Sequence, residues 1–163
     1  MAKPNIVSIT TSIKVYNQES DLSAADKKLL AAAHKAVHNA YAPYSQFNVG
    51  AAVLLSNGKI ITGNNQENAA YPSGTCAERA AVFYAASQFK SIKIKAIAIV
   101  SKSNNKKYKG PVSPCGACRQ VLAEYEKRGK NKMRIIMSSS DGKIYEAESV
   151  ESMLPLLFGR EQL

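Results

Sequence analysis

Hydrophobic and polar positions divide the first half of this chain into one helical segment and two strand-like segments. Residues 23–40 (SAADKKLLAAAHKAVHNA) repeat apolar side chains at intervals of three and four, which predicts an amphipathic helix. Ser23 is suited to cap this helix, with Asp26 in its first turn. Two apolar runs, VGAAVLL and KIITGN, flank the Ser-Asn-Gly sequence at 56–58. They predict a β-hairpin, because Asn-Gly favours a tight turn between strands.

The second half alternates between helical and strand-like segments. A polar stretch leads into a predicted helix at 75–88, and KIKAIAIV at 93–100 is typical of a buried strand. The remaining predicted elements are a helix at 115–127, strands at 133–138 and 143–148, and a short helix at 150–158. This order predicts an α/β fold in which helices cover a sheet, and the initial hairpin makes that sheet mixed.

Residues 1–22 lie before this regular pattern. Within them, residues 5–16 (NIVSITTSIKVY) are rich in β-branched side chains and partly alternating, so they are a candidate for an added strand. No repeat or linker-like stretch interrupts residues 23–163. We therefore interpret 1–22 as an N-terminal extension and 23–163 as a single domain.

Composition is ordinary for a soluble globular protein, with 45% hydrophobic and 21% charged residues in a chain of 163. No apolar run approaches the ~20 residues of a membrane span, and the N-terminus has no apolar signal-peptide core. The three cysteines are an odd number, which argues against a disulfide framework. We expect a cytoplasmic protein, where cysteines more often bind metal or react.

A formal net charge of +10 raises the question of a nucleic-acid partner. Many of the lysines fall in loop-like segments at 102–109 and 127–134, few aromatic residues lie among them, and no nucleic-acid-binding motif is present. The charge therefore favours a lysine-rich soluble surface over a nucleic-acid interface.

The cysteines stand where helices are predicted to begin. Cys76 opens one helix, and Cys115 and Cys118 follow Pro114 at the start of another. A single C-x-x-C pair is ambiguous between a redox pair and half of a zinc site. Three thiolates at two helix N-termini favour zinc, because helix N-termini lower thiol pKa values. A histidine at 34 or 38 could in principle close the site as a fourth ligand, although neither has zinc-finger spacing.

Glu78 lies two residues after Cys76, where a carboxylate could transfer protons beside an open zinc site. The C-A-E at 76–78 and the P-C-x-x-C at 114–118 resemble the zinc-dependent nucleoside and nucleobase deaminases. Because the first residue of the C-A-E motif is cysteine rather than histidine, the sequence resembles the small homotetrameric cytidine deaminases in particular. The similarity extends to APYSQFNVGAA (42–52), GNNQENAAYPSGTCAERAA (63–81) and SPCGACRQVL (113–122).

The resemblance implies a three-layer α/β/α sandwich with a mixed sheet, assembled as a homotetramer with shared active sites. It implies one Zn²⁺ per subunit, a nucleoside substrate and a role in pyrimidine salvage. Glu78 would shuttle protons as cytidine or 2′-deoxycytidine is hydrolysed to the uridine product and ammonia. The implied zinc ligands are Cys76, Cys115 and Cys118, and the implied substrate-binding residues are Phe47, Asn65, Glu67, Ala77 and Phe158.

Three thiolates on Zn²⁺ give a net negative site, so a nearby cation should draw charge from the sulfurs. Arg79, three residues after Cys76, is our candidate for tuning the metal, and Arg119 is a second candidate. Two other functions remain open from the sequence. One is deamination of another nucleoside, as in blasticidin S deaminase-like enzymes, which lack the NQEN pair at 65 and 67. The other is a basic, zinc-stabilised nucleic-acid-binding module, which leaves Glu78 without a role.

Overall fold

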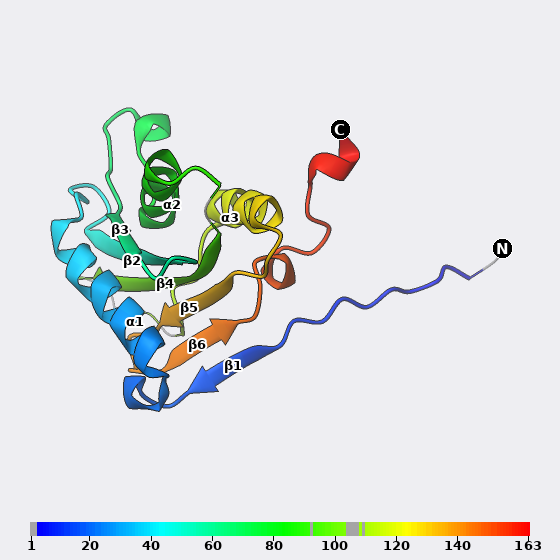
Figure 1. Ribbon diagram of the computed structural model, residues 1–163, viewed down its shortest axis with the longest axis horizontal. Helices are drawn as coiled ribbons and strands as arrows, with labels where there is room; N and C mark the ends of the chain where they lie inside the picture. Colours follow the sequence, from blue (N-terminus) through cyan, green and yellow to red (C-terminus); the bar gives the residue numbers. More distant parts are fainter. Residues whose placement is uncertain (1–2, 92, 104–107, 109) are drawn as a thin grey trace.

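The computed structural model of this chain describes residues 3–91, 93–103, 108 and 110–163, and three α-helices cover a six-stranded sheet in it (Figure 1). The strand order is β1-β6-β5-β4-β2-β3. The pair β4 and β5 is parallel and every other neighbouring pair is antiparallel, so the sheet is mixed, as predicted. The strands are β1 (Ile13–Tyr16), β2 (Phe47–Leu55), β3 (Ile60–Asn64), β4 (Ile94–Ser103), β5 (Arg134–Ser138) and β6 (Ile144–Ala147).

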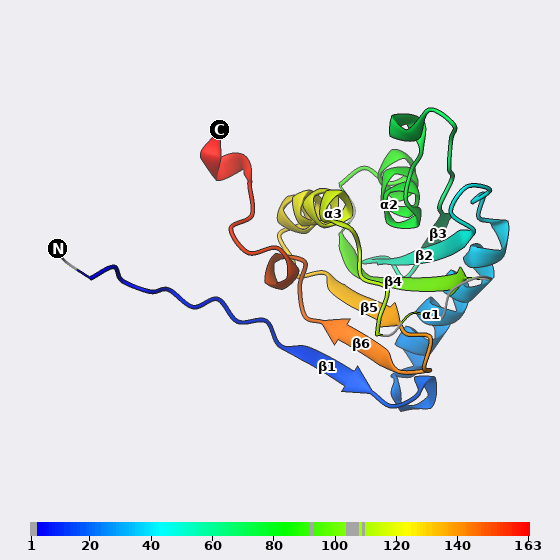
Figure 2. The same cartoon turned by 180° about the vertical axis from the view of Figure 1, so that it is seen from behind.

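The helices form the two outer layers. Helix α1 (Ala24–Ala36) packs on one face of the sheet, and α2 (Ala77–Gln88) and α3 (Gly116–Gly129) pack on the other (Figure 1, Figure 2). Ser23 caps α1 as predicted, because its hydroxyl accepts a hydrogen bond from the Asp26 backbone N–H at 3.2 Å. The predicted three-layer α/β/α sandwich is therefore confirmed. Among the described residues, no helix is long and apolar enough to cross a membrane.

The central strand β4 is buried on both faces, and its side chains alternate between two cores. Ile97 and Ile99 pack beneath α2 and α3, whereas Ala96 and Ala98 pack beneath α1. This alternation follows from the period of two along a strand, and it explains why the segment is a nearly continuous apolar run. Small side chains on the α1 face allow that helix to lie close to the sheet.

Gly63 brings α2 into close contact with β3. A Cβ at this position would lie 2.4 Å from the Ala81 backbone nitrogen and 2.7 Å from the Ala77 carbonyl oxygen. Only glycine fits between these two backbones without displacing the helix. Gly63 thereby fixes the height of α2 above the sheet, and with it the position of the first turn that carries the candidate site.

The C-terminal segment differs from the predicted helix at 150–158. Only a short 3₁₀ turn forms, η4 (Glu151–Met153), followed by an irregular stretch and a second turn, η5 (Arg160–Gln162). Pro155 disfavours helical geometry in the residue before it, and Leu156 adopts a left-handed φ of 56°. The predicted loop at 102–109 falls partly outside the described residues, since 104–107 and 109 are not among them.

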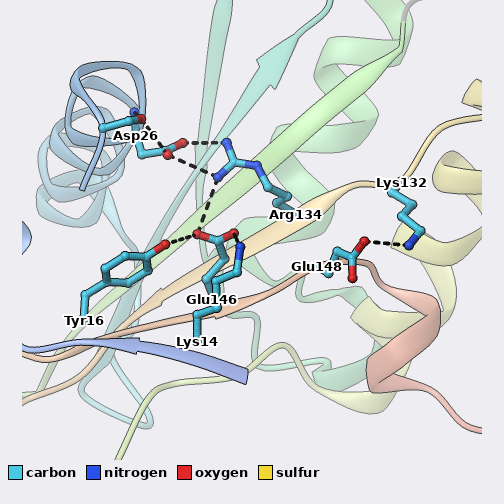
Figure 3. Close-up of polar contacts among 8 residues, drawn as sticks. Lys14, Tyr16, Asp26, Lys132, Arg134, Glu146 and Glu148 are labelled. Carbon is cyan, nitrogen blue, oxygen red and sulfur yellow. Dashed lines mark hydrogen bonds and ion pairs between the residues drawn. The ribbon is translucent and has the colours of Figure 1, made fainter. Parts of the chain in front are cut away.

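A polar network attaches β1 to the rest of the sheet on the α1 face (Figure 3). Tyr16 donates its hydroxyl to the Glu146 carboxylate at 3.0 Å, and the Lys14 ammonium lies 3.4 Å from the same group. Arg134 lies 3.6 Å from Glu146 and donates to both oxygens of Asp26, at 2.6 and 3.1 Å. Burial opposes ionisation of Asp26, but hydrogen bonds from Arg134 and its neighbours lower the pKa of this carboxyl. The network links α1, β5, β6 and β1.

Residues 13–16 form a strand within the candidate segment 5–16, at the edge of the sheet beside β6. Residues 3–12 are extended and exposed, and they project away from the body of the protein on the same side as the C-terminus (Figure 1, Figure 2). The division into an extension at 1–22 and a domain at 23–163 remains a prediction.

Candidate active site

The N-terminal ends of α2 and α3 bring the three cysteines together. Cys76 is the N-cap residue of α2, Cys115 is the N-cap residue of α3, and Cys118 lies in the first turn of α3. Their sulfur atoms all lie within 4.8 Å of one another. Cys118 is buried, Cys76 is half-buried and Cys115 is exposed, so the cluster has one open side.

The donor set and spacing of this cluster fit zinc. Three thiolates at the usual Zn–S distance of ~2.3 Å would lie roughly 3.8 Å apart in a tetrahedral site. Sulfurs already within 4.8 Å of one another need only small side-chain movements to reach that geometry. Thiolate ligands select zinc over hard cations, and three protein ligands are typical of catalytic zinc, whereas structural sites usually have four.

Electrostatics around the sulfurs favour a thiolate even before a metal binds. A hydrogen bond from Cys118 lowers the pKa of the Cys76 thiol to about 5. Arg79 acts in the same direction, whereas burial opposes the shift. The same hydrogen bond, together with burial, raises the pKa of the Cys118 thiol. The contact between the two sulfurs and the nearby Arg79 therefore favour a thiolate within the cluster.

Glu78 lies in the first turn of α2 and is only 5% exposed. Burial raises the pKa of its carboxyl above the usual value, and the adjacent Cys76 thiolate acts in the same direction. A buried carboxyl two residues from one of the clustered thiols is a group that can both accept and return a proton beside the cluster.

The two arginines considered in the sequence lie in different environments. Arg79 donates from Nη2 to the Cys76 sulfur at 3.7 Å, and the charge of that sulfur raises the pKa of Arg79. Arg119 instead donates to the carbonyl oxygens of Pro114 and Met153, at 2.9 and 3.0 Å. The hydrogen bonds of Arg119 thus go to the backbone and to Ser113 rather than to a cysteine sulfur. Arg119 fastens the loop before Cys115 to η4, a contact made across 34 residues of sequence.

Asn65, after β3, fixes the start of β2. Its side-chain oxygen accepts from the Val49 N–H at 2.7 Å, and its amide nitrogen donates to the Phe47 carbonyl at 3.0 Å. Phe47 is half-buried, and its ring lies edge-on to Tyr108 with centroids 5.6 Å apart. The structure thus connects Asn65 and Phe47 directly. Tyr108 was missed from the sequence because it lies in a lysine-rich loop with no motif.

Glu67 lies close to this pair in sequence and holds the preceding loop. One of its oxygens accepts from the backbone N–H groups of Tyr44 and Ser45, at 2.9 and 3.2 Å. A hydrogen bond from the Ser45 side chain is the main cause that lowers the pKa of the Glu67 carboxyl, and the two backbone N–H groups add to it. Glu67 is therefore an anion near neutral pH. The two backbone N–H groups share its Oε2 atom, so the carboxylate is anchored to the loop at 44–45.

The remaining predicted residues lie in two different settings. Ala77 is fully buried at the start of α2, so only its backbone can face a ligand. Phe158 is 58% exposed on the C-terminal tail, where its carbonyl accepts from Gln120 of α3 at 2.9 Å. His34 lies in the last turn of α1 and His38 in the 3₁₀ turn that follows it (Val37–Asn39), on the opposite face of the sheet from α2 and α3. Among the described residues the cysteine cluster includes no histidine, so a closed Cys₃His site is not formed.

Comparison with known proteins points in one direction. Residues 23–131 match the family described as the cytidine and deoxycytidylate deaminase zinc-binding region. A cytidine deaminase from Sporosarcina psychrophila is 44% identical over 137 residues, covering 84% of this chain and 93% of that protein. A cytidine deaminase from Halalkalibacterium halodurans is 41% identical over 135 residues, covering 83% of this chain and 95% of that protein.

Solved structures agree with the sequence relatives. The crystal structure of cytidine deaminase from Burkholderia pseudomallei superposes with a TM-score of 0.69 at 40% identity, covering 80% of this chain and 97% of that one. The crystal structure of cytidine deaminase from Mycobacterium tuberculosis superposes with a TM-score of 0.65 at 32% identity, covering 84% of this chain and 99% of that one.

Proposed function

This chain belongs to the cytidine and deoxycytidylate deaminase family, and we propose that it hydrolyses cytidine and 2′-deoxycytidine to uridine and 2′-deoxyuridine with release of ammonia. The observation that carries this proposal is the cluster of Cys76, Cys115 and Cys118 beside the buried Glu78. A metal site built only for stability would leave that carboxyl without a purpose.

The three cysteines would hold one zinc ion per subunit. Bound there, zinc supplies Lewis acidity, which makes water a usable nucleophile near neutral pH. The thiolates set the position of the reacting centre at the N-terminal ends of α2 and α3. Both helix dipoles stabilise negative charge at that point.

Glu78 would move the protons of the reaction. As the water oxygen adds to C4 of the cytosine ring, the Glu78 carboxylate takes its proton and delivers it to N3. The carboxylate then passes the second proton of that water to the departing amine, and ammonia leaves as the C4 carbonyl of uracil forms. One carboxyl can serve both steps because its acid and base roles alternate. Its burial excludes bulk water from these transfers.

Phe47, Asn65 and Glu67 would bind the nucleoside. The Phe47 ring offers an apolar surface for the base, and the Ala77 backbone would contact the pyrimidine edge. Asn65 and Glu67 would bind the ribose hydroxyls, because an amide and a carboxylate together offer a donor and acceptors. The hydrogen bonds from Asn65 to Val49 and Phe47 support this role, since they hold the sugar side and the base side in one fixed arrangement.

The direct test is turnover by the purified, zinc-loaded protein, followed as the fall in near-ultraviolet absorbance when cytosine becomes uracil. We expect hydrolysis of both cytidine and 2′-deoxycytidine. Preference for a blasticidin-type nucleoside would show that the chemistry is right and the substrate is wrong. Intact zinc with no deamination of any of these compounds would favour a structural metal, and steeply salt-dependent binding of RNA would then support the nucleic-acid-binding alternative.

Glu67→Gln is expected to lower kcat/KM for cytidine about tenfold, because a charge-assisted hydrogen bond to a ribose hydroxyl is lost. For 1-methylcytosine, which lacks the sugar, the same substitution should leave the weaker kcat/KM unchanged. Steady-state kinetics with both substrates checks this. An equal loss on both would mean that Glu67 acts only by holding the loop through Tyr44 and Ser45.

Arg79 would tune the metal through its hydrogen bond to the Cys76 sulfur. Arg79→Ala should raise the dissociation constant for zinc roughly 10–100-fold, the usual effect of losing a partner of a metal ligand. Competition with a chromogenic chelator measures this. Arg128→Ala is the matched control, because Arg128 stacks on Tyr125 at the far end of α3 and should leave zinc affinity unchanged.

We further propose a cytoplasmic enzyme of pyrimidine salvage that assembles as a homotetramer with shared active sites. Reduced cysteines are needed for the ligand set, which fits a reducing compartment. Several large apolar side chains are exposed on the isolated chain, as expected if partner subunits cover them: Tyr71, Phe83, Tyr84, Leu156 and Phe158. Light scattering coupled to size-exclusion chromatography would reveal a monomer if this assembly is wrong.

A further inference from the structure

The N-terminal arm, residues 3–12, continues the strand β1 with an apolar stripe. The stripe consists of Val7, Ile9, Thr11, Ile13 and Val15, all β-branched and all at odd positions. Successive side chains of an extended chain point to opposite faces, so these five share one face from the arm into β1. Such a stripe is typical of a strand of nine or more residues in a sheet, about twice the length that β1 pairs here.

Most of this strand has no partner among the described residues. β6 pairs only with residues 13–16, and β1 is the terminal strand of the sheet, so its outer edge is open. The arm is exposed throughout, with Val7 at 86% and Ile9 at 56%. Figure 1 and Figure 2 show it running straight past the end of β6. Unpaired backbone beside β-branched side chains is a template for another strand.

We propose that the arm and the outer edge of β1 pair with the same segment of a second copy of this chain. An antiparallel pairing centred on Thr11 places each arm along the other copy's β1. Val7 then lies opposite Val15, and Ile9 lies opposite Ile13, so the stripes of both copies share one face of the ribbon. This register satisfies both unpaired features, the arm and the edge, with one two-fold contact.

The opposite face of the same register is also compatible. Ile6 lies opposite Tyr16, Ser8 lies opposite Lys14, and Thr10 lies opposite Ser12, so no two like charges meet. Residues 4–13 carry no charged side chain, in a chain whose net charge is +10. Two copies therefore approach along this segment with little of the repulsion that their other surfaces produce.

Polar contacts connect the root of the arm and β1 to the body of the protein. Thr11 donates its hydroxyl to the Ser152 carbonyl of η4 at 2.5 Å. Tyr16 and Lys14 are fixed to Glu146 on the other face (Figure 3). The two-fold contact joins two six-stranded sheets into one continuous sheet. This inference does not depend on the proposed reaction, since none of its residues belongs to the candidate site.

Cross-linking of the full-length, zinc-loaded protein tests the register. The two-fold places residue 11 opposite itself, with the Cβ atoms about 5 Å apart. In contrast, Ser8 and its copy would be separated by six positions, about 20 Å. We expect Thr11→Cys to give at least about fivefold more covalent dimer with a short bis-maleimide than Ser8→Cys. The two thiols at position 8 would lie too far apart for that linker to span. The unsubstituted chain gives the background from its three native thiols.

A second pair of variants tests the apolar stripe with the same measurement. Adding Ile9→Lys to Thr11→Cys should slow dimer formation about tenfold, because two lysines per dimer replace apolar cross-strand pairs. Adding Ser56→Lys, in the exposed hairpin turn, should leave the rate unchanged. Circular dichroism confirms that every variant is folded. Equal cross-linking at residues 8 and 11, dimer no greater than background at residue 11, or no effect of Ile9→Lys would each overturn the proposal.

Discussion

Glu78→Gln is expected to reduce kcat for cytidine by about 10²–10⁴-fold, the usual contribution of a positioned general acid and base. Glutamine has the same shape and can still form hydrogen bonds, but it cannot take a proton from water or return one to N3 or to the amine. Because Glu78 is buried, its neutral replacement places no new charge in a low-dielectric site. The loss should therefore appear in kcat, while zinc content and the free energy of unfolding change little.

Absorbance-based turnover and metal analysis of the same samples check this result. Glu124→Gln is the matched control, since Glu124 is an exposed glutamate on the neighbouring helix α3 and should retain full activity. A Glu78→Gln protein that keeps more than about a tenth of the native kcat would show that another group moves the protons. A protein that loses its zinc as well would show that Glu78 supports the metal site rather than the reaction.

Cys118→Ser is expected to weaken zinc binding roughly 10²–10³-fold and to abolish deamination at ordinary metal concentrations. Serine fills nearly the same volume, but its hydroxyl remains protonated near neutral pH and is a poor ligand for this ion. Zinc bound by a full set of protein ligands gains ~10–16 kcal/mol, so the loss of one ligand removes roughly 3–4 kcal/mol. The buried position of Cys118 prevents a neighbouring side chain from replacing it easily.

Chelator competition measures this dissociation constant directly, and graded addition of zinc separates affinity from chemistry. At saturating zinc, turnover should return only in part, because the geometry of the ligand set has changed. Arg79→Ala provides the intermediate point of the series, since it removes a partner of a ligand rather than a ligand. If Cys118→Ser retained native zinc affinity and activity, the ligand assignment would be wrong.

Local signals were sufficient to predict the cysteine cluster and the sandwich. Cys76 and Cys115 each follow a Gly- or Pro-containing turn at the start of an amphipathic segment, so their places as N-cap residues could be expected from the sequence alone. Helices that start at the same edge of one sheet bring their first turns together, and this placed Cys118 with them. The apolar run of β4 likewise identified a strand buried on both faces.

What could not be predicted depends on distant contacts. Arg119 was considered a partner of the sulfurs because it follows Cys118, yet its position is set by a carbonyl of η4. Tyr108, which follows β4 in the chain, contacts Phe47 at the start of β2, and no local pattern indicates that pairing. The helix expected at 150–158 was wrong, because it was inferred from the apolar pattern of this segment. These residues pack as an irregular segment, since Pro155 and the left-handed Leu156 interrupt any helix.

The placement of the proposed zinc ligands at the starts of two helices has a consequence for the unfolded chain. A metal ion that joins Cys76 to Cys115 closes a loop of about 40 residues, as a disulfide would, and so restricts the disordered ensemble. The chain-entropy relation for a cross-link of this length gives about 4 kcal/mol, a large share of the net stability of a small domain. The zinc ion would thus also stabilise the fold by cross-linking the starts of two helices. A molecule that loses it would be inactive and would also unfold and be degraded more readily.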